Sequence, residues 1–260
     1  MMNEKNGETP HIPDYIVEWR DVRKSFGDNR VLNGATLGVQ RGETLVIIGQ
    51  SGSGKSVLVK TLLGLVVPDG GEVLVEGRNV LENRHAMDAG LKLFGMVFQN
   101  SALFDSMNVA ENLALPYWES TSWTREQIMQ RVTELLGMVG LRNIEHLMPS
   151  ELSGGMKKRV GLARALADEP EIIIYDEPTT GLDPIMADAI NQLIRRIQNE
   201  VRVTSIVITH DLSTVRYTAD RVALLHNGKI VFYGTADELF ASGNEHVRRF
   251  VSGTFETEYV

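Results

Sequence analysis

The segment that decides the fold reads Gly49-Gln50-Ser51-Gly52-Ser53-Gly54-Lys55-Ser56-Val57, and it matches the pattern G-x-x-x-x-G-K-[ST] at every fixed position. Residues 44–48, rich in Val and Ile, predict a buried strand before it, and residues 55–65 predict a helix after it. In this context the glycines let backbone N–H groups point at phosphate oxygens, and the helix adds its positive end. We therefore expect residues 49–57 to bind a nucleoside triphosphate, with Lys55 reaching the β- and γ-phosphates and the Ser56 hydroxyl ligating Mg²⁺. A flexible Gly/Ser turn is the alternative, but every fixed position and both flanking elements match.

An acidic pair, Asp176 and Glu177, follows the aliphatic run at residues 172–175. At the carboxyl end of such a strand, Asp176 is placed to hold Mg²⁺ through water. Glu177 is then placed to accept a proton from the attacking water or to orient it. Acidic residues that merely end a strand at the surface are the alternative, and the phosphate loop in the same chain favours the catalytic interpretation.

A second glycine-rich motif, Leu152-Ser153-Gly154-Gly155-Met156, precedes a helical pattern over residues 157–166. Two adjacent glycines before a helix expose its first N–H groups, and such a helix end binds anions. The Ser153 hydroxyl can donate a hydrogen bond as well. Ser-Gly-Gly alone is a common turn, but here it adds a second phosphate-binding helix end to a chain that already has one.

With Gly181-Leu182-Asp183 and the lone His210, these motifs stand in the order typical of the nucleotide-binding subunit of ATP-binding cassette (ABC) transporters, which the chain resembles over residues 16–249. The resemblance implies an α/β fold of the P-loop NTPase class, with a RecA-like core, an antiparallel β subdomain and an inserted helical subdomain. It implies ATP and Mg²⁺ as ligands. It also implies a head-to-tail homodimer, in which the phosphate loop of one copy and the Ser153 segment of the other enclose each ATP.

The same resemblance implies roles for four further residues. Phe26 occupies the position of an aromatic ring that stacks on adenine. Gln99 occupies that of a glutamine that contacts Mg²⁺ and water and links the core to the helical subdomain. Asp183 lies where the family crosses the dimer interface, and His210 resembles the switch histidine that contacts the γ-phosphate. Taken alone, each of these residues could have a purely structural role. Their functional roles depend on the order of the motifs along the chain.

Met156 departs from the family pattern, where glutamine is usual, and the departure resembles the cassettes of Mla/Mce lipid-transport systems. Met148-Pro149-Ser150-Glu151, residues 98–109 and residues 247–250 add to that likeness. It implies phospholipid transport through an integral-membrane permease, at the cytoplasmic face of the inner membrane. A small regulatory subunit and a periplasmic lipid-binding protein are implied by the same likeness.

Length and composition suit one domain of this kind. The chain has 260 residues, 43% of them apolar, and a formal net charge of −8, a balance that argues against nucleic acid as a partner. It has no cysteine, and no apolar run approaches the ~20 residues that cross a bilayer. We expect a disordered leader (1–14), an ABC ATPase domain (15–250) and a tail (251–260). Within the domain we expect a core (15–99 and 167–250) and a helical subdomain (100–166).

Alternation of Val- and Ile-rich runs with helical patterns favours a mainly parallel sheet preceded by an antiparallel portion. No strand pattern occurs between residues 100 and 167. The remaining patterns predict helices at residues 125–139 and 237–249, and strands at residues 16–19, 31–39, 71–75, 95–99, 204–208, 221–225 and 229–233.

Other functions fit part of the pattern. A soluble ABC ATPase, such as a scaffold ATPase of iron–sulfur assembly, has a similar length, and an importer or exporter of another substrate carries the same motifs. A regulatory module without turnover is expected to lack Glu177 or His210, and both are present. A P-loop kinase or GTPase does not explain Ser153-Gly154-Gly155.

Overall fold

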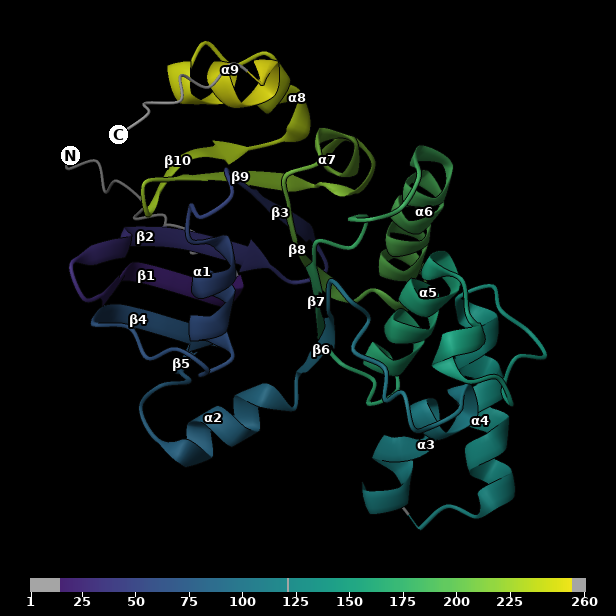
Figure 1. Ribbon diagram of the computed structural model, residues 1–260. Helices are drawn as coiled ribbons and strands as arrows, with labels where there is room; N and C mark the ends of the chain where they lie inside the picture. Colours follow the sequence, from purple (N-terminus) through teal and green to yellow (C-terminus); the bar gives the residue numbers. More distant parts are fainter. Residues whose placement is uncertain (1–14, 121, 254–260) are drawn as a thin grey trace, which may run out of the picture.

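The computed structural model describes residues 15–120 and 122–253, which two β-sheets organise (Figure 1). The first sheet is antiparallel and has the order β2-β1-β4-β5. The second has the order β10-β9-β3-β8-β7-β6; it is parallel from β9 to β6, and β10 is antiparallel at its edge. The strands are β1 (Tyr15–Phe26), β2 (Asn29–Gln40), β3 (Thr44–Ile48), β4 (Gly70–Val75), β5 (Arg78–Asn79), β6 (Phe94–Val97), β7 (Ile172–Asp176), β8 (Thr204–Thr209), β9 (Arg221–His226) and β10 (Lys229–Gly234).

The parallel sheet is covered on both faces, and its central strand β3 shows this directly. Leu45 and Ile47 belong to one hydrophobic cluster and Val46 and Ile48 to another, because successive side chains of a strand point to opposite faces. Helix α1 (Lys55–Leu62) contributes to the first cluster, between the two sheets. The Trp19 indole of β1 donates a hydrogen bond to a backbone carbonyl of α1 at 3.2 Å and so joins the antiparallel sheet to this helix.

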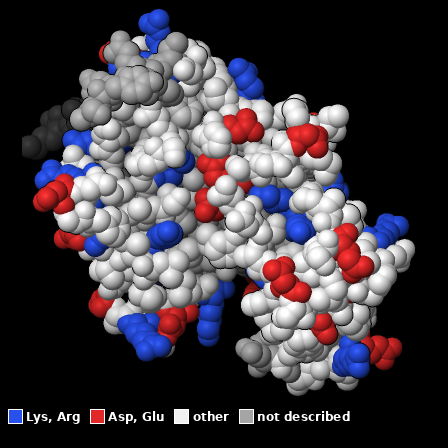
Figure 2. All heavy atoms as spheres, in the orientation of Figure 1, with Lys and Arg blue, Asp and Glu red and all other residues white. Residues whose placement is uncertain are grey.

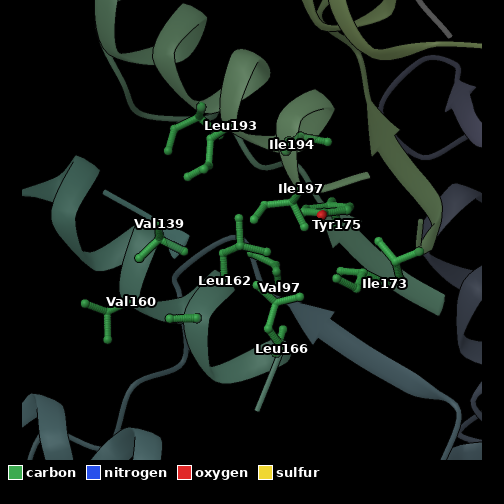
Figure 3. Close-up of a cluster of buried hydrophobic side chains, with 14 of the residues drawn as sticks. Val97, Val139, Val160, Leu162, Leu166, Ile173, Tyr175, Leu193, Ile194 and Ile197 are labelled. Carbon is green, nitrogen blue, oxygen red and sulfur yellow. The ribbon is translucent and has the colours of Figure 1, made fainter. Parts of the chain in front are cut away.

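The second cluster lies on the other face of the parallel sheet, where helices cover it (Figure 3). Leu162 of α5 and Ile197 of α6 belong to it together with Val97 and Tyr175 of the sheet. Helices α3 and α4 pack against each other and against α5. The helices that follow α1 are α2 (Arg84–Leu91), α3 (Val109–Ser120), α4 (Arg125–Met138), α5 (Gly154–Ala165), α6 (Pro184–Val201), α7 (Leu212–Thr218), α8 (Ala236–Phe240) and α9 (Glu245–Ser252).

Some predicted helices differ from the observed ones. The single helix predicted over residues 237–249 is wrong, because α8 and α9 are separate. Asn244 takes an extended conformation and its side chain accepts a hydrogen bond from the His246 N–H at 2.9 Å, so the chain leaves the helix before α9 begins. Helix α6, the longest of the described helices, has no counterpart in the predictions, although Asp183 and Pro184 are a common helix start.

The order of the strands brings the predicted motifs together. Strands β3, β8, β7 and β6 are parallel neighbours, so their carboxyl ends lie at one edge of the sheet. The phosphate loop follows β3, and Gln99, Glu177 and His210 follow β6, β7 and β8. The predicted parallel sheet with an antiparallel portion is confirmed, and it is what places these residues side by side.

The outer surface carries charges of both signs. On the face shown in Figure 2, Lys and Arg are interspersed with Asp and Glu. Within the described ranges, no helix combines the length and the apolar composition needed to cross a bilayer. The predicted leader at residues 1–14 and residues 254–260 of the predicted tail lie outside those ranges.

Candidate nucleotide-binding site

A cavity of about 680 Å³ lies at the carboxyl edge of the parallel sheet. Ten of the predicted site residues line it, and they come from four segments that follow or end strands β3, β6, β7 and β8. These ten are Gly49, Gln50, Ser51, Gly52, Lys55, Ser56, Gln99, Asp176, Glu177 and His210. The tertiary structure therefore gathers the phosphate loop, the glutamine, the acidic pair and the histidine around one space large enough for a small ligand.

The phosphate loop holds its lysine inside itself. Gly54 caps α1 in a left-handed conformation (φ 103°), which a side chain would strain. The next residue, Lys55, is buried, and its Nζ donates to the carbonyl oxygens of Gly49 at 2.8 Å and Gln50 at 2.9 Å. Burial lowers the pKa of Lys55, while the nearby acidic pair acts in the opposite direction. The loop thus presents an ammonium group to any anion in the cavity.

The acidic pair lines the same cavity as that lysine. Burial raises the pKa of Asp176, and so does the neighbouring Glu177. The Glu177 carboxylate is held by three partners: Oε1 lies 2.9 Å from His210 Nδ1, and Oε2 accepts hydrogen bonds from Thr180 Oγ1 at 3.1 Å and from Thr209 Oγ1 at 3.4 Å. A carboxylate fixed in this way next to a phosphate site can orient a water molecule or accept its proton.

The donor set of the cavity fits Mg²⁺. The Ser56 hydroxyl, the Asp176 carboxylate and the Gln99 amide are hard oxygen donors that line the same space. In the described part of the chain, no three His, Cys, Asp or Glu residues form a metal-binding cluster. One hydroxyl, one carboxylate and one amide suit a cation that takes few protein ligands and completes its shell with water and phosphate oxygens.

The second glycine-rich motif is fully formed but is not part of the cavity lining. Ser153 is the N-cap of α5 and accepts a hydrogen bond from the Met156 N–H at 3.2 Å. Helix α5 begins at Gly154, three residues earlier than predicted, so the glycines form its first turn. Ser153 and Gly154 are exposed, whereas Gly155 is buried against Met186 of α6. An exposed helix end of this kind can bind an anion that comes from outside the chain.

Other predicted residues also lie away from the lining. Ser53 and Gly54 belong to the phosphate loop, and Val57 packs against the first hydrophobic cluster. Phe26 is half exposed, with the Lys24 ammonium 5.3 Å from its ring centre. Asp183 caps α6 and accepts hydrogen bonds at 3.0 Å from the N–H groups of two residues in its first turn.

Four lining residues are absent from the sequence predictions: Thr180, Leu212, Phe250 and Gly253. Thr180 stands three residues after Glu177, and its place between two motifs was a usable signal. Leu212 follows His210 at the start of α7. Phe250 and Gly253 come from α9 and its C-cap, and no local pattern connects that helix with the phosphate loop.

A profile of the ABC transporter family matches residues 32–180. The chain belongs to the ABC transporter family. This ABC protein is 40% identical over 262 residues to the chloroplastic protein TRIGALACTOSYLDIACYLGLYCEROL 3 of Arabidopsis thaliana, an alignment that covers 94% of this chain and 75% of that protein. It is 39% identical over 238 residues to the probable ribonucleotide transport ATP-binding protein mkl of Mycobacterium leprae, covering 91% of this chain and 69% of that protein.

Solved structures agree with this assignment. The ABC protein superposes on cbiO1 of Clostridium perfringens, part of the ABC transporter complex cbiONQ, with a TM-score of 0.81 and 30% identity, covering 93% of this chain and 96% of that one. It also superposes on the ATP-binding cassette MJ0796, solved as a dimer in a post-hydrolysis state with ADP and Pi, with a TM-score of 0.75 and 30% identity, covering 85% and 98% of the two chains. The predicted P-loop ABC fold is confirmed, and the protein is an ATPase whose ligands are ATP and Mg²⁺.

Proposed function

We propose that this ABC ATPase works as a homodimer that powers phospholipid transport through an integral-membrane permease, at the cytoplasmic face of the inner membrane. The observation that carries the dimer is the separation, within one chain, of two phosphate-binding helix ends. The phosphate loop lines the cavity, whereas the exposed Ser153 segment does not. A second copy in head-to-tail orientation brings its own Ser153 segment to the open side of the cavity, and the related cassette MJ0796 is dimeric.

In the proposed dimer each of these side chains has a task. Lys55 and the backbone N–H groups of the phosphate loop bind the β- and γ-phosphates. His210 of the same chain approaches the γ-phosphate from a second side, and the second copy's Ser153 approaches it from a third. Glu177, oriented by His210 at 2.9 Å, takes a proton from the attacking water or orients that water. Ser56, Asp176 and Gln99 would hold Mg²⁺, which when bound would supply positive charge beside the phosphates.

The permease is expected to dock on the helical subdomain that we assign to residues 100–166. A groove of about 680 Å³ runs between α3 and α4 there, with the half-exposed indoles of Trp118 and Trp123 at its wall. The groove overlaps the segment predicted for this contact at residues 104–115. Phe98 and Phe104, on either side of Gln99, are also partly exposed. A partner bound there would contact the segment that carries Gln99 and would respond to its movement.

The choice of phospholipid rests on likeness. Met156 and the flanking segments resemble Mla/Mce cassettes, and the Arabidopsis relative is named for a glycolipid. A second candidate is ribonucleotide transport, because the mycobacterial relative carries that description. A regulatory subunit and a periplasmic lipid-binding protein belong to the first candidate.

The test is Glu177→Gln. The variant keeps the shape of the side chain but removes the negative charge, so phosphate release should fall by about 10²- to 10⁴-fold while ATP still binds and the protein accumulates as an ATP-bound dimer in size-exclusion chromatography. Glu171→Gln is the matched control, because Glu171 is exposed at the opposite end of the same strand, where it pairs with Arg41. Normal turnover in Glu177→Gln, or a monomer with bound ATP, would contradict the proposal.

The cargo is tested separately. The ATPase is copurified with its permease and reconstituted into vesicles that contain a fluorescent phospholipid. ATP-dependent movement of the lipid that disappears with Glu177→Gln supports the first candidate. ATP-dependent uptake of a labelled ribonucleotide, with the lipid unmoved, would support the second.

A further inference from the structure

A buried lysine outside the motifs joins two loops of the nucleotide site. Lys158 lies on α5, and its Nζ donates to the carbonyl oxygen of Gln99 at 2.5 Å and to that of Glu177 at 3.3 Å. We propose that Lys158 is a positioning residue that holds Gln99 and Glu177 in place for ATP hydrolysis and so ties α5 to the nucleotide site of its own chain. The inference rests on the proposed roles of Gln99 and Glu177, and it adds a residue that neither the motifs nor the relatives' names point to.

The burial of Lys158 indicates that its charge has a function. Burying an ammonium group is costly, and an apolar side chain of similar volume usually packs there at lower cost. Burial lowers the pKa of Lys158, and the carboxylates of Asp176 and Glu177 act in the opposite direction. The cation therefore lies beside the acidic pair, and it donates to the main-chain carbonyls of two cavity-lining residues although Lys158 itself does not line the cavity.

The Glu177 main chain needs support of this kind. Its φ of 49° is in the left-handed region, which is strained for a residue that carries a side chain. The Glu177 N–H donates to Ile208 O at 2.9 Å, and the Glu177 carbonyl accepts from Lys158. Both backbone groups are thus held while the side chain reaches His210. The Thr180 N–H also donates to the Glu177 carbonyl, at 3.3 Å, so loss of the Lys158 bond leaves that local turn and removes the tie between this carbonyl and α5.

The segment after Gln99 is attached to the same side of α5. Ser101 and Ala102 are both left-handed, with φ of 60° and 47°. A Cβ on Gly161 would lie 3.3 Å from Ser101, and Arg164 donates to Ala102 O at 2.8 Å. Lys158, Gly161 and Arg164 are three residues apart, so they form one stripe along the helix that faces residues 99–102. Lys158 is the member of the stripe that also reaches Glu177.

This attachment has a consequence in the dimer. In the proposed dimer Ser153, the N-cap of α5, faces the ATP of the second copy, and Lys158 lies on the same helix and contacts the nucleotide site of its own chain. A shift of α5 when the neighbouring ATP binds therefore moves the carbonyl contacts of Gln99 and Glu177 directly. The geometry couples the two nucleotide sites through one helix, with Lys158 as the contact.

The test compares Lys158→Met with Lys158→Arg and with a control on the same helix. Arg159→Met is the control, because Arg159 is also partly buried and its Nη1 donates to a backbone carbonyl, that of Val139, away from the cavity. We expect Lys158→Met to lower kcat for ATP by about ten- to a hundredfold with the ATP Kd changed less than about twofold, since a small displacement of catalytic groups costs rate rather than binding. Lys158→Arg should recover most of kcat, and Arg159→Met should keep it.

A second measurement does not depend on hydrolysis. Hydrogen–deuterium exchange of the nucleotide-free protein should be faster at residues 99–104 and 177–180 in Lys158→Met, and unchanged there in Arg159→Met. If Lys158→Met does not fold, Lys158→Gln is measured in its place. Unchanged exchange at both segments, a kcat within about twofold of the wild type, or an equal loss in Arg159→Met would overturn the proposal. A wild-type protein without phosphate release would contradict the proposed function instead, and the exchange measurement would still decide on Lys158.

Discussion

Replacing Lys55 with alanine removes the ammonium group from the phosphate loop. In the structure this group makes two hydrogen bonds, to Gly49 O at 2.8 Å and to Gln50 O at 2.9 Å. When ATP binds, the same N–H groups are expected to exchange carbonyl oxygens for phosphate oxygens. The variant therefore loses contacts with the nucleotide and also leaves two carbonyls of the loop without their donor.

The size of the effect follows from these two bonds. A hydrogen bond that involves a charged group contributes about 1.5–3 kcal/mol, so two of them to phosphate contribute about 3–6 kcal/mol before the exchange is counted. The ammonium group gives up two carbonyl partners to reach ATP. The variant is therefore expected to lose binding free energy for ATP near the low end of this range, about 3 kcal/mol. That corresponds to an increase in Kd of about 100-fold, since every 1.4 kcal/mol is tenfold.

Isothermal titration calorimetry with ATP and Mg²⁺ measures this Kd. Lys60→Ala is the matched control, because Lys60 lies on the same helix, is exposed, and does not line the cavity. Its Kd should stay within about threefold of the wild type, and the melting temperature of both variants shows whether the loop still folds. A Kd for Lys55→Ala close to that of Lys60→Ala would refute the assignment of the phosphate loop.

Two further predictions concern stability. Gly95→Ala should destabilise the fold by about 1–3 kcal/mol in urea titrations, because its Cβ would lie 2.3 Å from the carbonyl oxygen of Ala165; an unchanged urea midpoint would show that β6 and α5 can separate freely. The hydrogen bond from Lys24 lowers the pKa of Asp69, so the wild type should be more stable than Asp69→Asn above the unfolded pKa of about 4 and lose this advantage as pH falls through the lower folded value. Melting temperatures at pH 7 and pH 2.5 measure the difference, which should be smaller at pH 2.5; an equal difference at both would contradict this reading.

The phosphate loop was predictable because all of its information is local. Nine successive residues from Gly49 to Val57 carry the pattern, and the strand before them and the helix after them have clear periodicity. The acidic pair was predictable because it ends a short aliphatic run. Gln99 and His210 were assigned only through their order in the family series, since a single polar residue after a strand has no pattern of its own.

The elements without strong periodicity were predicted less well. The break between α8 and α9 depends on the Asn244 cap. The prediction of one helix over residues 237–249 did not take this cap into account. The start of α5 was placed three residues late, because glycines are poor helix formers and yet form its first turn under the Ser153 cap. In both places a side chain that binds the backbone outweighed the intrinsic preference of the residues.

The amino-acid sequence by itself determined the motifs and the strands of the parallel sheet that precede them, because both depend on residues that are neighbours along the chain. Only the tertiary structure decided which distant segments meet. It placed Glu177 beside His210, kept Ser153 outside the cavity of its own chain, and buried Lys158 between two loops that lie 59 and 19 residues away from it. Such contacts depend on how parallel strands align and how helices pack across them, and packing between distant segments leaves no periodic trace in the sequence.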